Sequence, residues 1–385
     1  MEYSLTVRRR GEVLFQSGGK WLHPLLDLEE AMHQNGWDPK ELSLEDKIVG
    51  KAAAFLIVRM GIPCVYAHLL SELAIEVFLR YGVAFQWEER LPQIACQTEQ
   101  ILATIEDPEE AALVILRRAG RDREIPLIVE SLYVYRGNRP VLENLTFAAT
   151  RGDRVVIWGP NGVGKSTLLR SILGLLPIEK GTIWILGKGR RDPAGIGYLA
   201  QGSEGGDFNI TVEEAVEVGT IRFHCSLRER EERIRKALSL TGMDALRKRT
   251  LRSLSGGERR KTELARLFAQ EPSILLLDEP TTNLDPEAKR EVLTVLQRYT
   301  EERKATIVMV SHEDVHFNLP GWRYRLLSNG RLYPEALSGD TPPGGLEDIH
   351  VLSRFLEVND SCLPHKDPID GKSGDFIDSF PSKEG

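Results

Sequence analysis

The chain lacks the features of an exported protein held together by disulfides. Its 385 residues include four cysteines, which lie far apart and form no Cys-x-x-Cys pair. A chain of this length can bury a core large enough to fold without disulfides. The first residues also contain no apolar signal core. We therefore expect reduced thiols and a cytoplasmic protein.

Long apolar runs and an excess of positive charge are also missing. The most apolar stretch, residues 52–87, is interrupted by charged residues, so no window of about 18 uncharged residues remains to span a membrane. Fifty Lys and Arg against 57 Asp and Glu leave a formal net charge of −7, whereas binding nucleic acid through bulk charge requires a basic surface. The composition predicts neither a membrane-spanning segment nor a nucleic-acid partner.

The length predicts two domains, and the apolar pattern places a small α/β domain at residues 1–105. The charge-rich segment 106–125 is predicted to be a linker with at least one helical turn. Within the first domain we predict strands at 3–7, 12–16, 64–68 and 83–87 and helices at 25–33, 44–60 and 71–81.

A second α/β domain is predicted at residues 126–335. Its unbroken apolar runs suit strands buried on both faces of a mostly parallel sheet. The remaining residues, 336–385, are rich in Gly, Pro, Ser and Asp and are predicted to be a largely disordered tail with one short helix at 348–356. The predicted strands of the second domain are 154–158, 182–186, 274–277 and 306–310.

A glycine-rich phosphate-binding loop follows the first of these strands and precedes a helical run, as a P-loop requires. Backbone N–H groups of such a loop surround phosphate oxygens, and the next helix points its positive end at them. We expect Lys165 to bind the β- and γ-phosphates and Ser166 to bind Mg²⁺. The predicted ATP-binding residues of the loop are Gly159, Pro160, Asn161, Gly162, Val163, Gly164, Lys165, Ser166 and Thr167.

Polar side chains end two of the other predicted strands. Asp278 and Glu279 follow the run 274–277, and His312 closely follows the run 306–310. Ligands of α/β folds collect at the carboxyl edge of the sheet. We therefore expect Asp278 to hold Mg²⁺ and Glu279 to polarise the attacking water, with His312 at the same edge.

A second anion-binding helix start is predicted at Leu254-Ser-Gly-Gly-Glu258, ahead of the helical run 259–269. One subunit already has a phosphate-binding loop, so a second one is redundant within that subunit. The motif is useful if it faces the γ-phosphate held by another subunit.

These residues together resemble the ATP-binding-cassette (ABC) ATPase family over about residues 126–333. The resemblance implies a P-loop NTPase fold with a helical subdomain near residues 211–252, and a homodimer that binds ATP and Mg²⁺ between two cassettes. It implies that Tyr135 stacks on adenine, that Asp285 lies in a loop at the dimer interface and that the catalytic residues are Glu279, His312 and Lys165. It further implies that Mg²⁺ is bound by Ser166, Gln201 and Asp278. It also implies a signature motif that acts in trans, on the nucleotide of the other subunit, formed by Leu254, Ser255, Gly256, Gly257 and Glu258.

Within this family, residues 208–219 are similar to a segment of the ATPases of metal-ion and iron-chelate importers. We therefore predict the ATP-hydrolysing subunit of an ABC transporter that imports a metal ion or metal chelate, attached to transmembrane permease subunits at the inner face of the cell membrane. Two alternatives stay open. One is a soluble ABC ATPase acting on nucleic acid or a protein assembly, and the other is an N-terminal metabolite-binding enzyme domain fused to the cassette.

The N-terminal domain resembles a family of small prokaryotic domains with a cytidine-deaminase-like fold. A zinc deaminase needs His-x-Glu and Pro-Cys-x-x-Cys motifs, and Pro63-Cys64 has no second cysteine after it. We therefore expect no Zn²⁺ and a sensing or regulatory role. A polar cluster is predicted from Asp46, Lys47, Lys51, Ser71, Glu72, Cys96 and Glu99, with the alternative that Asp46 and Ser71 only cap helices.

Overall fold

The computed structural model describes residues 3–122, 125–189, 195–202, 209–221, 225–312 and 321–334. The predicted tail from residue 336, its short helix at 348–356 and the start of the importer-like segment at Phe208 lie outside these described residues.

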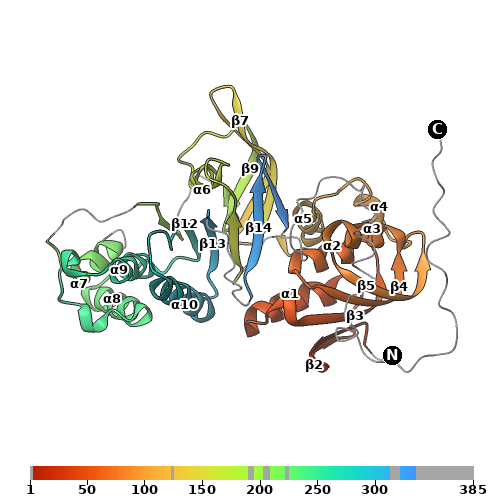
Figure 1. Cartoon of the computed structure of the whole chain (residues 1–385), viewed down its shortest axis with the longest axis horizontal. Coiled ribbons are helices and arrows are strands. Elements are labelled where there is room, and N and C mark those ends of the chain that lie inside the picture. The colour runs from red at the N-terminus through yellow and green to blue at the C-terminus, as the bar shows by residue number, and fades with distance from the viewer. Residues whose placement is uncertain are drawn as a thin grey trace.

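The N-terminal domain is an α/β unit built on a five-stranded sheet, seen at the right of Figure 1. Strands β3, β4 and β5 run parallel, and β1 pairs antiparallel with both β2 and β3. The strand order is β2 (Glu12–Ser17), β1 (Leu5–Arg9), β3 (Leu42–Val49), β4 (Cys64–Ser71), β5 (Ala84–Leu91). Its helices are α1 (His23–Asn35), α2 (Lys51–Met60), α3 (Glu72–Tyr81) and α4 (Gln97–Ile101).

The predicted helix at 44–60 is wrong in its first half. Residues 42–49 form β3, and α2 begins only after Gly50, which is the N-cap in an extended conformation. Leu42 and Leu44 alternate with partly exposed polar residues, which is the period of a strand with one buried face. The backbone N–H and C=O groups of β3 form hydrogen bonds with β1 on one side and β4 on the other. This sheet pairing outweighs the helical spacing of Leu44 and its neighbours.

The segment predicted to be a linker forms a regular helix, α5 (Pro108–Arg118). Asp107 caps it by accepting hydrogen bonds from the backbone N–H groups of Glu109 and Glu110 at 2.8 and 2.9 Å. Buried alanines and leucines on one face join the core of the N-terminal domain. The charges that suggested a linker lie mainly at the ends of the helix, so composition alone concealed its apolar face.

The cassette has two sheets (Figure 1). In its described part, the larger sheet has the order β11 (Ile196–Leu199), β12 (Ile274–Asp278), β13 (Thr306–Ser311), β8 (Arg154–Trp158), β14 (Arg323–Ser328), β15 (Arg331–Pro334), and all pairs but β14–β15 are parallel. The smaller sheet is antiparallel, with the order β10 (Lys188–Gly189), β9 (Lys180–Ile185), β6 (Leu127–Arg136), β7 (Arg139–Ala149).

The predicted strand at 182–186 therefore belongs to the antiparallel sheet and not to the parallel one. Its alternating exposure, with Ile183 and Ile185 buried and Trp184 exposed, is that of a strand with one solvated face.

Helices α7 (Val212–Glu217), α8 (Leu227–Thr241) and α9 (Gly256–Phe268) form the helical region at the left of Figure 1, next to α10 (Pro286–Arg303). Thr211 with Glu214 and Ser226 with Glu229 form capping boxes at the starts of α7 and α8. No helix of the described residues is long and apolar enough to cross a membrane.

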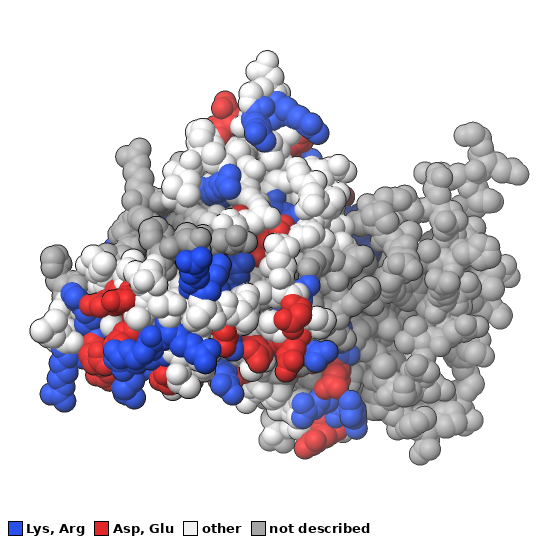
Figure 2. Space-filling model, turned by 60° about the vertical axis from the view of Figure 1, so that its left-hand side comes forward, with Lys and Arg blue, Asp and Glu red and all other residues white. Residues whose placement is uncertain are grey.

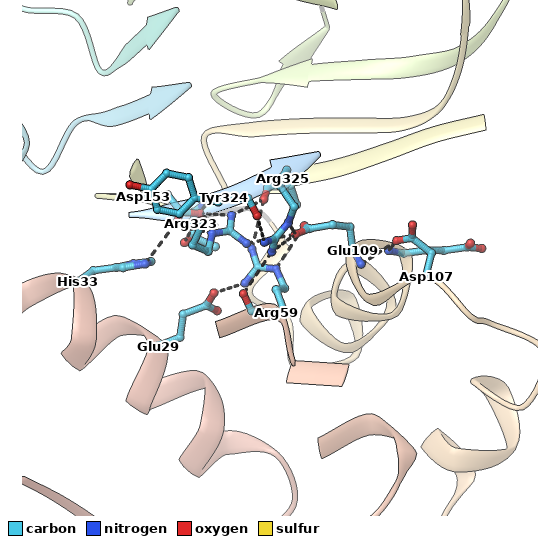
Figure 3. A network of polar contacts seen from close by, with 12 residues as sticks. Glu29, His33, Arg59, Asp107, Glu109, Asp153, Arg323, Tyr324 and Arg325 are labelled. Carbon is cyan, nitrogen blue, oxygen red and sulfur yellow. Dashed lines mark hydrogen bonds and ion pairs between the residues drawn. The ribbon is translucent and has the colours of Figure 1, made fainter. Parts of the chain in front are cut away.

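A buried network of six charged side chains joins the two domains (Figure 3). Glu29, Arg59 and Glu109 come from the N-terminal domain; Asp153, Arg323 and Arg325 come from the cassette, and the three cations balance the three carboxylates.

The cassette arginines bind their carboxylates at two points each. Arg323 donates to Asp153 Oδ1 at 2.9 Å and Oδ2 at 2.5 Å, while Arg325 donates through Nε and Nη2 to Glu109 Oε1 at 2.8 and 2.6 Å. Arg59 pairs with Glu29 and with Glu109 and also donates to the carbonyl of Ala148 in β7 at 3.2 Å.

The network holds two of its carboxylates, Glu109 and Asp153, in the ionised form. Burial would raise the pKa of Glu109, but Arg325, Arg59 and Arg323 lower it to about 2. Burial would likewise raise the pKa of Asp153, and Arg323 together with His33 keeps it well below its usual value. Buried charges of this kind are stable only when each has its partner.

We predict that Arg59→Met destabilises the protein by about 3–5 kcal/mol, because it leaves Glu29 buried without its cation. The measurement is the free energy of unfolding from urea titration. Lys236→Met is the control, since Lys236 belongs to an exposed i,i+4 pair with Glu232 and the loss of such a pair changes the free energy of unfolding little. Equal losses in the two variants would contradict a structural role for the network.

Candidate functional site

A cavity of about 850 Å³ lies at the carboxyl edge of the parallel sheet, around the loop between β8 and α6 (Lys165–Ile172). It brings together most of the predicted ATP-site residues from segments far apart in the chain. The predicted residues that line it are Asn161, Gly162, Val163, Gly164, Lys165, Ser166, Thr167, Gln201, Glu279 and His312.

The P-loop has the tight geometry that its glycines permit. A Cβ at Gly159 would lie 2.5 Å from the carbonyl oxygen of Leu327 in β14, so no larger residue fits there. Lys165 is buried and donates from Nζ to the carbonyls of Gly159 at 2.7 Å and Pro160 at 3.0 Å. Burial lowers its pKa. The ammonium thus lies within the loop, where phosphate oxygens can replace these carbonyls as its partners.

Ser166 and Asp278 provide adjacent oxygen donors. Ser166 Oγ donates to Asp278 Oδ1 at 3.0 Å, and burial raises the pKa of Asp278. Oδ2 of this fully buried carboxylate has no hydrogen-bond partner among the described residues. Hydroxyl, carboxylate and amide oxygens are the ligands that Mg²⁺ prefers. Ser166 and Asp278 therefore fit a Mg²⁺ ion, and Gln201 lines the same cavity as Ser166.

Glu279 is the centre of a second polar group. Its Oε2 accepts hydrogen bonds from Gln201 Nε2 at 2.8 Å and from Thr282 Oγ1 at 3.1 Å. His312 Nδ1 lies 2.9 Å from Oε1. The backbone of Glu279 is in the left-handed region, with φ of +52°, a conformation that non-glycine residues adopt mainly where the fold requires it. The carboxylate is thereby aimed into the cavity, where it can orient and polarise a water molecule.

Sequence reasoning missed several residues of this site. Thr282 follows Glu279 by three positions, and its hydroxyl fixes the carboxylate. Arg136 and Arg139 line the cavity from the β6–β7 turn, and Asn329 with Gly330 lines it from the β14–β15 turn. A basic turn next to a phosphate loop could have indicated the two arginines. Asn329 and Gly330 are far from every motif in sequence, and only the pairing of β14 with β8 brings them close.

Some predicted residues lie outside the cavity wall. Tyr135 is at the end of β6 with 45% of its surface exposed, beside the lining residue Arg136. Ser255 caps α9, since its Oγ accepts from Glu258 N at 3.2 Å and its N–H donates to the Glu258 carboxylate at 2.8 Å. Residues 254–258 line no part of this chain's own cavity. Asp285 caps α10.

In the N-terminal domain, Glu99 is a buried carboxylate that joins three segments. Its Oε1 accepts from Ser71 Oγ at 2.8 Å and from the backbone N–H of Lys51 at 3.3 Å, and its Oε2 accepts from Ile94 N at 2.7 Å. Cys96 caps α4 through a contact with Glu99 N at 3.4 Å. The predicted cluster is therefore partly formed, around the starts of α2 and α3.

The other predicted members of this cluster have separate surroundings. Ser71 caps α3, but Asp46 lies inside β3, so the alternative that Asp46 only caps a helix is wrong. Glu72 Oε1 lies 3.6 Å from Arg90 Nε. Lys47 lies in β3, next to Asp46. Within the described residues, no three His, Cys, Asp or Glu side chains come close enough to hold a metal ion.

Comparisons with known proteins identify both parts of the chain. The sequence profile of the ABC transporter family matches residues 142–282, and that of a domain of unknown function, DUF1893, matches residues 1–117. The chain is 34% identical over 268 residues to the energy-coupling factor transporter ATP-binding protein EcfA of Methanoculleus marisnigri, covering 64% of this chain and 95% of that protein. The corresponding protein of Methanothermobacter thermautotrophicus is 33% identical over 232 residues, covering 58% and 72%.

Among solved structures, CbiO1 of Clostridium perfringens, described as part of the ABC transporter complex CbiONQ, is 28% identical with a TM-score of 0.50, covering 55% of this chain and 87% of that one. The fold and the site define a P-loop ATPase. More particularly, the chain belongs to the ATP-binding subunits of ABC transporters, and it binds and hydrolyses ATP. It differs from a cassette alone in its N-terminal DUF1893 domain, whose match extends into α5 as far as residue 117.

We predict that Asp46→Asn stabilises the protein at pH 8 and has little effect at pH 4. Burial raises the pKa of Asp46 to about 7, from about 3.8 in the unfolded chain. The folded state therefore binds the proton more tightly, and the stability that this gives is lost as the pH rises through 7. Asn keeps an oxygen that can accept from Ile48 N without the buried charge, so we expect a gain on the order of 2 kcal/mol at pH 8.

Thermal unfolding at the two pH values measures this effect. Asp244→Asn serves as the control, because Asp244 lies in an exposed 3-10 turn. A gain for Asp46→Asn that is equal at pH 4 and pH 8 would contradict the raised pKa of this half-buried carboxyl.

Proposed function

We propose that the chain is the energising subunit of an importer, in which two copies close around two ATP molecules and drive a transmembrane permease at the inner face of the cell membrane. The observation that supports this best is the division of the phosphate-binding groups. One set lines the cavity, whereas the capped helix start at residues 254–258 lies elsewhere on the same chain. A second copy can supply that helix start to the cavity.

In this proposal the chain's residues act on the γ-phosphate of ATP. Backbone N–H groups of the P-loop and the ammonium of Lys165 bind the β- and γ-phosphates. Glu279 orients the attacking water, while Gln201, Thr282 and His312 hold its carboxylate. Mg²⁺, held by Ser166, Asp278 and Gln201, would supply positive charge that offsets the charge developing on the phosphate oxygens. Tyr135, with its exposed ring, would stack on adenine.

The helical region offers a surface for the permease. Three of its apolar residues are strongly exposed, Val218 at 50%, Ile221 at 67% and Leu227 at 81%. The N-terminal domain lies at the other end of the molecule and leaves this surface uncovered (Figure 1). Large apolar side chains exposed close together are typical of interaction surfaces.

Charge on this side of the molecule argues against a nucleic-acid partner. Figure 2 shows Lys and Arg interspersed with Asp and Glu on the face that the helical region presents. Along α8, acidic and basic residues alternate, and Lys236 pairs with Glu232 at 2.7 Å. A surface for phosphates would carry mainly one sign. The proposed cargo, a metal ion or metal chelate, is supported by the importer-like segment 208–219.

We predict that Glu279→Gln abolishes hydrolysis and accumulates an ATP-bound dimer, because the amide keeps the shape of the carboxylate but does not polarise water. Loss of a positioned base lowers kcat by about 10²- to 10⁴-fold. ATPase assays and size-exclusion chromatography with and without ATP measure the two effects.

Ser255→Arg in the same background should prevent the dimer while leaving ATP binding by the monomer intact, because Ser255 does not line its own cavity. A Glu279→Gln protein that stays monomeric in saturating ATP, or a double variant that still dimerises, would contradict the two-copy arrangement.

We predict that Ile221→Glu releases the protein from the membranes of its native host and leaves the ATPase activity of the purified subunit unchanged. A charge at this exposed apolar position opposes burial against a permease. Membrane pelleting followed by immunoblotting gives the bound fraction. Ile48→Glu is the matched control, since Ile48 is 49% exposed on the N-terminal domain. Wild-type protein that is absent from the membrane pellet would favour the alternative of a soluble ATPase.

A further inference from the structure

A second cavity, of about 720 Å³, lies where the N-terminal domain meets the cassette. The N-terminal domain contributes α1 and residues around the end of α5. The cassette contributes the turn between β7 and β8, at residues 150–152, and the end of α10. The size is that of a pocket for a small molecule, for which about 300–1,000 Å³ is usual.

The wall of this cavity has an apolar part. Leu26, Leu116 and Ile125 line it, and each is no more than 4% exposed in the folded chain. An apolar group of a ligand can pack against these side chains and leave water.

Positive charge lies on the same wall. Arg151 and Lys304 both line the cavity and are exposed, and neither has an ion pair among the described residues. The other cation, Arg121, pairs with Asp27. On the acidic side, Glu30 accepts a hydrogen bond from Gln34 at 3.0 Å.

The remaining acidic group, Glu29, is neutralised by Arg59 in the buried network. Two cations, Arg151 and Lys304, then outnumber one charged carboxylate, Glu30, so the net charge left for a ligand is positive.

The turn that presents Arg151 is held firmly. Thr150 donates from its backbone N–H and its hydroxyl to Asp153 Oδ2, at 2.9 and 3.2 Å. Thr306 in β13 donates to the carbonyl of Thr150 at 2.7 Å. Lys304 is fixed in a left-handed conformation at the end of α10, where its backbone N–H donates to Thr300. The backbones that carry both cations are thus positioned before any ligand arrives, which reduces the entropic cost of binding.

We propose that this cavity binds a small organic anion, with its apolar body against Leu26, Leu116 and Ile125 and its carboxylate, sulfonate or phosphate group near Arg151 and Lys304. The ligand would contact both domains at once. It would also lie beside two further lining residues that contact the interdomain network. Glu29 is a member of the network, and His33 Nε2 lies 3.1 Å from Asp153 Oδ1.

The test uses 8-anilinonaphthalene-1-sulfonate, an organic anion that fluoresces when it leaves water, titrated into the full-length protein. Saturating Mg²⁺ and a non-hydrolysable ATP analogue occupy the nucleotide cavity. We expect one saturable site, with Kd raised about tenfold by Arg151→Glu and by Lys304→Asn, because each removes a charge-assisted contact. Asn is chosen at 304 because it tolerates the left-handed backbone.

Arg235→Glu, on the exposed face of α8, is the charge-matched control and should leave Kd unchanged. Unchanged ATPase activity verifies that each variant is folded. Phenyl phosphate should displace the probe, and phenol at the same concentration should not. The proposal is overturned if no saturable site exists, if the cavity variants bind like wild type, or if phenol competes as well as phenyl phosphate.

Discussion

The pairing of Glu109 with Arg323 and Arg325 is the interaction on which the arrangement of this molecule depends. Each guanidinium is buried, and in the interior an unpaired cation costs several kcal/mol. The carboxylate that compensates Arg325 comes from α5, in the other domain. Arg59 completes the contact by donating to Glu109 and to the carbonyl of Ala148 in β7. The two domains therefore stabilise each other's buried charges.

The same strands connect this network with the nucleotide cavity. Asp153 directly precedes β8, and the P-loop directly follows β8. In the same way, Arg323 is the first residue of β14, and Asn329 and Gly330 follow the last residue of β14. Each strand spans about 16–20 Å at about 3.3 Å per residue. β8 and β14 are paired in parallel register, so the contact with the N-terminal domain lies towards their amino ends and the nucleotide cavity at their carboxyl ends. The N-terminal domain thus leaves the catalytic edge of the sheet open.

The fold of the cassette, and the meeting of its motifs at one cavity, could be predicted from the sequence because each motif is local. Each motif consists of a buried strand followed by polar groups at its end: Gly159 to Thr167, Asp278 with Glu279, and His312. Parallel pairing of these strands brings their carboxyl ends together. The interdomain network could not be predicted, because Glu109 and Arg323 are 214 residues apart and each belongs to an ordinary-looking charged segment. The spacing of Leu44 and its neighbours fits both a helix and a strand, so the sequence predicts a helix from residue 44, and only the pairing of β3 with β1 and β4 selects the strand up to Val49.

The buried arginines of β14 also constrain how this chain could have arisen. In a cassette without the N-terminal domain, Arg325 would lack its carboxylate, and Arg323 would keep only Asp153. Natural selection on such a cassette would favour neutral side chains at 323 and 325. Gain or loss of the N-terminal domain in evolution therefore requires coordinated substitutions in β14. In a related protein, the side-chain charge at these two positions indicates whether its cassette packs against such a domain.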